Sequence, residues 1–488
     1  MTRLPRTAAV AMALATALAL AGCASPPDVA VPAPMRDAAS LGLAAGAAAS
    51  VPAIEAQWWR AFGDPQLDAL VDQALAGHPS LRVARSRLAR AQAVTGVADA
   101  ALLPQVNAAA EATRQRFTRN GMVPAPLAGS VRESGLLQLS ASWELDFFGR
   151  YRAALDAALG QARAAQAEAD AAGVLLAGNL VRAWVQLARV QAQLGVAERT
   201  LAQRGEVLAL VKDRVAAGLD SQLELRQAEG AVPDARAQVE ALREQAQLAR
   251  NALAALAGRP GGLNLPADAQ LAALRPLAVP AVIPADLLGR RADVAAARAR
   301  VEAAGAEVDS ARAQFYPNVN LAAFAGLSSI GLGRLADGGS TQWGLTPAIR
   351  LPLFDAGRLR ANLRGKAADL DAAIAAYDAT VIDAVREAAD AAASSQGVAR
   401  QQAQQREAQQ GAEAAYDLAV QRYRAGLGNY LQVLAAENAV LAQRRAAVDL
   451  AARALEAQAG LARALGGGWT DRPDALAAAP APATKRAP

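Results

Sequence analysis

The segment LLQLSASWELDFF, residues 136–148, alternates apolar and polar side chains along its length. Every second position is apolar: Leu137, Leu139, Ala141, Trp143, Leu145 and Phe147. The positions between them are polar: Gln138, Ser140, Ser142, Glu144 and Asp146. Because successive side chains of a strand point to opposite faces, this pattern predicts a β-strand with one apolar and one polar face.

Three other segments have the same alternation. They follow Pro104 (QVNAAA), follow Pro317 (NVNLAA) and cover 342–353. Polar loops containing Gly and Pro separate the members of each pair. The sequence therefore predicts two β-hairpins, at 103–148 and 316–354, whose four strands are long enough to cross a membrane.

The two hairpins belong to two copies of one longer unit. Three glycine pairs recur at a constant spacing of 208 positions: Gly149 and Gly357, Gly218 and Gly426, Gly258 and Gly466. Their flanks match as well, since DRVAAGLDSQLELRQAE in the first copy corresponds to QRYRAGLGNYLQVLAAE in the second. The sequence thus predicts repeats at 53–260 and 286–467, joined by a linker at 261–285.

Most of each copy is rich in alanine, the strongest helix former. Residues 151–217 and 359–425 are proline-free stretches of 67 residues that each end at Ala-Gly-Leu. A glycine suits the left-handed position after a helix, and at 1.5 Å per residue each helix spans about 100 Å. Shorter return helices complete helical hairpins at 151–257 and 359–465.

The first residues, 1–22, have the layout of a signal peptide. Arg3 and Arg6 precede an apolar run that is too short to span a membrane. The run ends in LAGC at Cys23, the one cysteine of the chain. LAGC resembles a bacterial lipobox, which implies a lipid on Cys23 and, with Ala24 following, sorting to the outer membrane. An ordinary signal peptide that happens to contain a cysteine is the alternative.

The amino-acid composition argues against several classes of function. The net charge is +5, from 50 basic and 45 acidic residues, so no nucleic-acid partner is expected. One histidine, His78, and one cysteine supply few metal ligands, and no nucleophile–base arrangement or phosphate-binding loop is present. We therefore expect no metal, no cofactor and no enzyme activity. Residues 23–52 and 468–488, rich in Ala and Pro, are predicted to form a flexible tether and a disordered tail.

Four strands with one polar face cannot close a membrane barrel alone. Backbone groups in lipid must be paired, so the strands have to be completed by other copies. Two copies give about eight strands, whose interior is filled by side chains, whereas three copies give the first count that leaves a lumen. The strands therefore predict a homotrimer in contact with outer-membrane lipid.

Taken together, several motifs resemble the outer-membrane efflux factor family, the TolC/OprM-like lipoproteins. They are QWWRAFGDPQLDALVDQAL at 57–75, the two Pro-led strands, LPLFDAGR at 351–358 and the two Ala-Gly-Leu tips. The resemblance covers about 57–467. It implies a mainly α-helical fold with a transmembrane β-barrel: a trimeric 12-stranded barrel on a long periplasmic α-helical barrel.

The same resemblance implies a function. The chain would be the outer-membrane exit duct of a tripartite efflux pump, passing small molecules such as drugs. Its partners would be a periplasmic adaptor protein and an inner-membrane transporter, most often of the resistance-nodulation-division type. A duct for protein secretion and a periplasmic coiled-coil scaffold lipoprotein are the alternatives, and the sequence does not specify the substrate.

The resemblance also assigns roles at the hairpin tips. It implies that four residues contact the adaptor: Gly218, Leu219, Gly426 and Leu427. Relatives often carry aspartates in the second return helix, where this chain has Gly428, Gln432 and Ala435. Asp220 and Glu224 in the first tip are instead the candidates for an acidic gate, and solvated charges at a helix end are the alternative interpretation.

Three further gate candidates lie just before the second tip: Arg422, Tyr423 and Arg424. The resemblance implies that they link neighbouring helices at the closed periplasmic end. Arginines in the last turn of a helix also interact favourably with the helix dipole, which is the simpler explanation. Gln432 completes the set of gate candidates.

Overall fold

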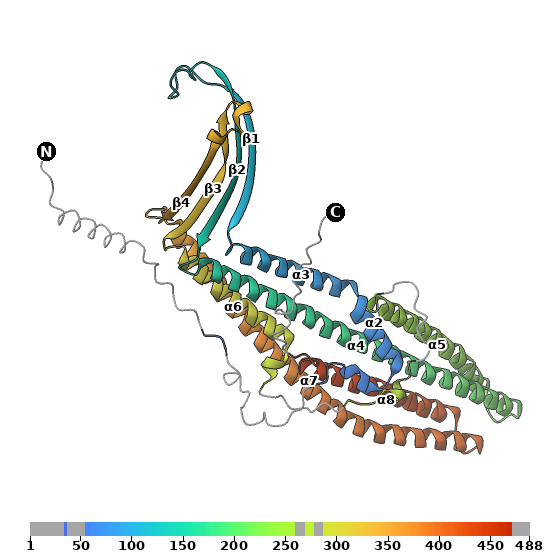
Figure 1. The fold of residues 1–488 in the computed structure, drawn as a ribbon. Coiled ribbons are helices and arrows are strands. Elements are labelled where there is room, and N and C mark those ends of the chain that lie inside the picture. The colour runs from blue at the N-terminus through green and yellow to red at the C-terminus, as the bar shows by residue number, and fades with distance from the viewer. Residues whose placement is uncertain (1–33, 37–53, 259–268, 278–285, 471–488) are drawn as a thin grey trace. The chain divides into compact units, whose positions relative to one another are not determined.

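The computed structural model describes residues 34–36, 54–258, 269–277 and 286–470 (Figure 1). Cys23, the signal peptide 1–22 and nearly all of the predicted tail lie outside the described residues. The elements in chain order are η3 (Trp58–Phe62), α2 (Pro65–Gly77), α3 (Pro79–Ala100), β1 (Gln105–Arg116), β2 (Val131–Leu145), α4 (Arg150–Ala216), α5 (Gln222–Leu256), η4 (Leu271–Ala273), η5 (Leu287–Arg290), α6 (Ala292–Ala313), β3 (Asn318–Ile330), η6 (Leu332–Arg334), η7 (Gly338–Ser340), β4 (Thr341–Arg350), α7 (Arg358–Arg424) and α8 (Tyr430–Ala464).

The chain forms two compact units that do not coincide with the two sequence repeats. One unit is built mainly from Leu88–Ala164 and Ala297–Tyr377, and it contains all four described strands. The other contains the helical hairpins from Ala165 and from Asp378 onward, and it includes Ala165–Ala296 and Asp378–Pro488 as far as they are described. Each unit therefore combines segments from both repeats, because equivalent elements of the two copies pack with one another.

The four strands form one antiparallel sheet in the order β1-β2-β3-β4 (Figure 1). Its register places the predicted apolar positions in common rows: Ala108 opposite Leu139, Leu139 opposite Ala325, and Ala325 opposite Trp343. The side chain at Trp343 is largely exposed in the single chain. The alternation in the sequence thus produced one continuous apolar face, as predicted.

The opposite face of the sheet carries polar side chains that bond across strands. The contacts are Gln342 Nε2 to Gln138 Oε1 (3.1 Å), Ser142 Oγ to Asn320 Oδ1 (3.1 Å) and Asn318 Nδ2 to Glu144 Oε2 (2.7 Å). Cross-strand pairs of this kind stabilise a sheet and fix its register. A polar face opposite an apolar face is the arrangement that a wall between lipid and water requires.

An aspartate at the end of each hairpin begins a long helix. Asp146 Oδ2 accepts hydrogen bonds from the backbone N–H groups of Tyr151 (3.1 Å) and Arg152 (2.8 Å) at the start of α4. In the second repeat Asp355 accepts from the N–H of Leu359 (2.9 Å) in α7. The first N–H groups of a helix have no partner within the helix, so these carboxylates fix where both long helices begin.

The main hydrophobic core lies in the unit that holds the helical hairpins. Trp58, Trp59 and Phe62 are buried there in one cluster with Trp184 of α4, so they are packing residues. Asp64 caps α2 and also accepts a hydrogen bond from Trp184 Nε1 (3.0 Å). Among the described helices α4 alone is apolar enough to cross a membrane, but half of its most apolar segment is buried.

The part of the predicted linker 261–285 that the structure describes, residues 269–277, packs on the main core. Leu274 and Leu277 are buried in the main core. The backbone N–H of Arg275 donates to Phe62 O (3.0 Å), and that of Leu277 donates to Gln458 Oε1 (2.9 Å). Apolar residues among the prolines and alanines of this segment gain more from burial than from exposure, so it packs as part of the core.

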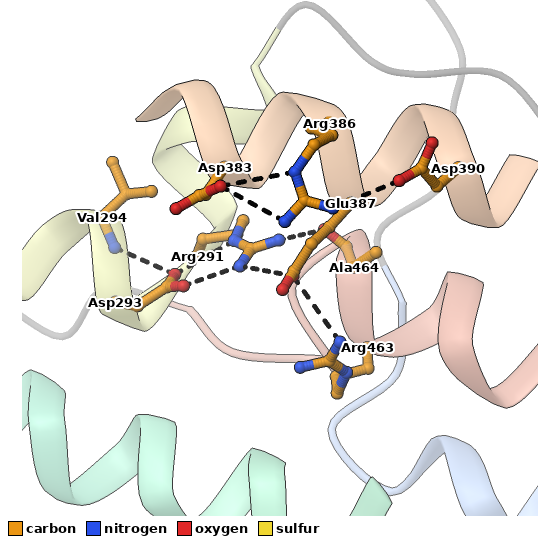
Figure 2. A network of polar contacts seen from close by, with 9 residues as sticks. All are labelled: Arg291, Asp293, Val294, Asp383, Arg386, Glu387, Asp390, Arg463 and Ala464. Carbon is orange, nitrogen blue, oxygen red and sulfur yellow. Dashed lines mark hydrogen bonds and ion pairs between the residues drawn. The ribbon is translucent and has the colours of Figure 1, made fainter. Parts of the chain in front are cut away.

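An ion network holds the start of α6 to the two hairpin helices of the second repeat (Figure 2). The buried guanidinium of Arg291 binds both carboxylate oxygens of Asp293 (3.0 and 2.6 Å) and Glu387 Oε2 of α7 (3.1 Å). It also donates to the backbone oxygen of Ala464 at the end of α8 (3.1 Å), and Arg463 lies 3.6 Å from Glu387. A planar donor with several N–H groups suits a junction where three helices meet.

Candidate functional site at the helical hairpin tips

Both helical hairpins turn through the same backbone motif. Gly218 and Gly426 have left-handed φ angles of 71° and 76°, directly after the long helices. In each tip the N–H of the residue after this glycine bonds back to the last turn of the long helix: Leu219 to Arg214 O (2.8 Å) and Leu427 to Arg422 O (2.8 Å). This is the Schellman motif, which satisfies the free carbonyl groups of a helix end and needs glycine at the left-handed position.

The return helices begin with two different caps. Ser221 and Glu224 form a capping box at the start of α5, in which Glu224 Oε2 accepts from the N–H of Ser221 (3.1 Å). Hydrogen bonds from Ser221 hold the pKa of Glu224 below its usual range. In the second tip Asn429 accepts from the N–H of Gln432 (3.0 Å). Among the gate candidates, Glu224 therefore has a capping role, and Gln432 occupies the equivalent position in the second tip.

Asp220 joins the first tip to the long helix of the second repeat. Its two carboxylate oxygens accept from Arg214 Nε (2.9 Å) and Nη2 (3.2 Å). The hydroxyl of Tyr423 donates to the same carboxylate. Arg214 Nη1 donates to the backbone oxygen of Tyr423 (3.0 Å), and its guanidinium carbon lies 4.6 Å from the centre of the Tyr423 ring. These three side chains form one unit, here called the tip link.

The tip link is sheltered from solvent. The side chains of Arg214 and Asp220 are only 11% and 9% exposed. The hydrogen bond from Arg214 holds the pKa of Asp220 below its usual range, and burial together with Asp220 raises the pKa of Tyr423. At neutral pH Asp220 is therefore ionised and Tyr423 is protonated, so every group in the link has a partner of suitable charge.

The second tip lacks this link. Arg422 is the position equivalent to Arg214, but Gly428 stands where the first tip has Asp220. Arg422 is exposed and donates instead to the backbone oxygen of Leu427 (3.3 Å). Arg424 is exposed as well, and within the described residues neither arginine forms an ion pair. Of the gate candidates, only Asp220 and Tyr423 are brought together.

Four leucines form the exposed apolar surface of the tips. Leu219 and Leu427, which were adaptor candidates, are 65% and 71% exposed. Leu223 and Leu431, one helical turn further on, are 63% and 62% exposed and were missed in the sequence. Two features of the sequence could have identified them. Leu223 and Leu431 are 208 positions apart, and each lies four positions after a leucine of the first pair. Exposed apolar patches of this kind mark interaction sites.

A packed layer supports the tips from behind. Tyr423 and Tyr430 are buried there with Val211 and Val433. Deeper in the same hairpins, the buried Glu437 binds Arg204 Nε (3.2 Å), and Arg204 also binds Asp234 (2.9 Å). Arg204 and Arg214 were not identified from the sequence, because nothing in their own helix marks which partner they meet. Among the described residues, no cluster is placed to hold a metal ion.

Comparison with known proteins identifies the family. The model of the family described as "Outer membrane efflux protein" matches residues 70–259 and 283–467. The chain belongs to this family. Outer membrane protein OprJ of Pseudomonas aeruginosa is 34% identical over 469 residues, covering 94% of this chain and 96% of that protein. Fusaric acid resistance protein FusA of Burkholderia cepacia is 38% identical over 366 residues, covering 72% and 67%.

Solved structures of outer-membrane proteins have the same fold as this chain. The outer membrane protein VceC of Vibrio cholerae has a TM-score of 0.79 at 36% identity, covering 85% of this chain and 99% of that one. The outer-membrane channel OprN has a TM-score of 0.81 at 31% identity, covering 92% and 100%. The chain is therefore an outer-membrane efflux channel with the duplicated fold of helices and strands expected from its sequence, and it serves as an exit duct.

Proposed function

We propose that three copies of this chain close a 12-stranded barrel and form the outer-membrane duct of a tripartite efflux pump. The observation that carries this proposal is the sheet itself, with one apolar face and one polar face. Within the described residues, the outer edges of β1 and β4 have no neighbouring strand. Unpaired backbone groups cost several kcal/mol each in lipid, so these edges need partners from other copies.

The number of copies follows from the lumen that a duct requires. Two chains would supply about eight strands, and side chains fill the interior of a barrel of that size. Three chains supply enough strands for a water-filled passage lined by the polar face. The long helices of the same three chains would extend the passage into the periplasm by roughly 100 Å at 1.5 Å per residue.

The tips are the proposed contact with a periplasmic adaptor. Their glycine turns carry little bulk, and their four exposed leucines offer an apolar surface for another helical tip. Relatives are named as outer membrane proteins of efflux pumps, such as toluene efflux pump protein TtgF of Pseudomonas putida. By this likeness the adaptor would join the duct to an inner-membrane transporter, of the resistance-nodulation-division type, and the cargo would be small organic molecules.

The tip link is the proposed gate element. It fastens the second long helix to the first tip through Asp220, and separation of these helices at the periplasmic end would have to break it. Arg422 and Arg424, exposed at the second tip, are available to bind a neighbouring copy. The duct itself would catalyse no reaction. A lipid on Cys23 would fix each chain beside the membrane that its strands cross.

Two measurements test the duct. Purified protein should run as a heat-resistant trimer on gels and should conduct ions in planar bilayers. A monomer without conductance would overturn the proposal. A monomer with strong helix content and no membrane association would favour the scaffold interpretation, while translocation of an unfolded polypeptide but of no small molecule would favour the secretion duct.

The adaptor surface has its own test. Leu219→Ser and Leu427→Ser should each weaken binding of a co-expressed periplasmic adaptor from the same genome by about tenfold or more, since burying one leucine contributes roughly 1.5–3 kcal/mol. Leu248→Ser is the matched control, because Leu248 is exposed on α5 away from the tip. Equal adaptor binding by the tip variants and the control would exclude the tips as the docking surface.

A further inference from the structure

The loop end of the sheet carries arginines on its apolar face. Loop 117–130 joins β1 to β2 at the end away from α3 and α4 (Figure 1). In the last part of the β1–β2 ladder before this loop, Arg114 lies opposite Glu133 and Arg116 lies opposite Val131. Both arginines are an even number of residues from Ala108, so they share the face on which Leu139 lies. The apolar face therefore ends in positive charge.

This charge is only partly compensated. The side chain of Arg114 is 75% exposed and lies 3.6 Å from Glu133. Arg116 is exposed, and in the described part of the chain no carboxylate pairs with it. Arg119, at the start of the loop, adds a third exposed guanidinium, whose stem lies against Gly129. The apolar face of this hairpin thus ends in two arginines and one glutamate, and the adjoining loop adds Arg119.

The polar face offers an internal comparison. Arg132 lies next to Glu133 on β2, opposite Gln115. Its position in the alternation directs it to the face that carries Gln138 and Ser142. Arg132 and Arg116 are therefore at the same depth of the sheet and on opposite sides of it.

We propose that Arg114 and Arg116 bind the phosphate groups of outer-leaflet lipid. The helices of this family are periplasmic, so the loop end of the strands faces the cell exterior, and the apolar face contacts lipid. Guanidinium groups bind phosphate oxygens through two parallel hydrogen bonds, and arginines just beyond an apolar band lie at headgroup depth. The inference rests on the closed barrel proposed above, which gives the sheet its lipid-facing side.

The test measures binding of fluorescent lipid A to the purified full-length protein in detergent. Removing one arginine near an anionic lipid surface weakens attraction by roughly fivefold, so Arg114→Gln with Arg116→Gln should weaken binding by about 25-fold. Arg132→Gln, the matched control on the polar face, should change binding by less than about twofold. Lipid A without phosphates should bind all variants equally weakly.

Three results would overturn the proposal. The first is unchanged lipid A binding by the double variant, and the second is an equal loss in Arg132→Gln. The third is displacement of lipid A by an equal concentration of inorganic phosphate, which would indicate a general anion site. The double variant should still form heat-resistant trimers and conduct ions normally. This control separates the lipid test from the test of the duct, because a variant that neither trimerised nor conducted would have failed to form the barrel.

Discussion

The two helical hairpin tips have the same backbone and different chemistry. Each ends its long helix at a left-handed glycine, turns through the same pair of hydrogen bonds, and exposes leucines at equivalent positions. Only the first tip, however, has an aspartate for its arginine, and of the two tips only this one forms a sheltered ion pair. Duplication preserved the features that a sharp turn requires, whereas the side chains that tie the tips together diverged.

The two tips therefore share their backbone shape but differ in how their side chains attach them to the other repeat. The shared turn gives both tips a small apolar end that another protein can contact. In the first tip, Arg214 pairs with Asp220, and Asp220 also binds Tyr423 of the second repeat. In the second tip, Arg422 donates to a backbone oxygen and has no acidic partner within the described residues. The next four experiments test this comparison.

The largest effect is expected from Arg214→Gln. This change leaves Asp220 ionised and sheltered without its main partner, which costs about 1.5–3 kcal/mol for a charged hydrogen bond. If the tip link holds the duct closed, conductance in planar bilayers should rise roughly tenfold or more. Arg422→Gln is the matched control at the equivalent position, and its conductance should stay within about twofold of the parent. A similar rise in both variants would show that the two arginines do not differ in function.

Acid should weaken the same link. Arg214 lowers the pKa of Asp220 from its ordinary value of 3.8, so the link contributes stability above that value and loses it as pH falls through the lowered pKa. Conductance should therefore remain flat from neutral pH to about pH 5 and increase only below about pH 4. Asp220→Asn should remove this dependence, and a rise already between pH 7 and pH 5 would point to another titrating group.

Alanine substitutions of the two tip glycines should destabilise their tips to the same extent. Replacing Gly218 or Gly426 with alanine forces a side chain into the left-handed region, at a cost of about 1–2 kcal/mol. Amide hydrogen exchange at the affected tip should become roughly fivefold faster or more in each case. Gly205→Ala, inside α4 with open space around it, should instead leave exchange unchanged or slower. Clearly unequal effects at the two tips would contradict their shared backbone motif.

The smallest effect is expected from rebuilding the link in the second tip. Gly428→Asp places a carboxylate near Arg422, and an added Cβ would lie 3.1 Å from the flexible end of Gln432 and at ordinary contact distance, 3.6 Å, from Arg422 Cβ and Tyr423 N. Because Arg422 is exposed, the new pair should contribute less than about 1 kcal/mol. A double-mutant cycle with Arg422→Gln, measured by thermal unfolding, gives this coupling energy. A coupling as large as that of a buried pair would mean that the second tip is less exposed than the single chain indicates.

Much of the fold was predictable because its signals are local. Strict alternation in residues 136–148 specified a strand and its two faces, and the register of the sheet confirmed them. Gly218 and Gly426 marked the ends of the long helices, since few other residues adopt the required φ. The packing of 269–277 within the predicted linker was not predictable, because its few leucines form no periodic pattern and only the tertiary structure shows the core that they contact.

The candidate site was only partly predictable. Asp220 and Tyr423 were identified as gate residues, but the sequence suggested free acidic charge at Asp220, and the structure places Arg214 beside it. Arg214 and Tyr423 are 209 positions apart, and helical periodicity gives no information on which faces of helices from different repeats meet.

The sequence by itself determined the elements, the duplication and the turn at each tip, because these depend on side chains within a few positions of one another. Only the tertiary structure decided that Tyr423 of α7 contacts the Arg214–Asp220 pair and that Arg291 reaches Glu387 (Figure 2). Those contacts join residues far apart in the sequence, so they depend on how separate helices pack, and they form only where packing brings the partners within a few ångströms and shelters them from water.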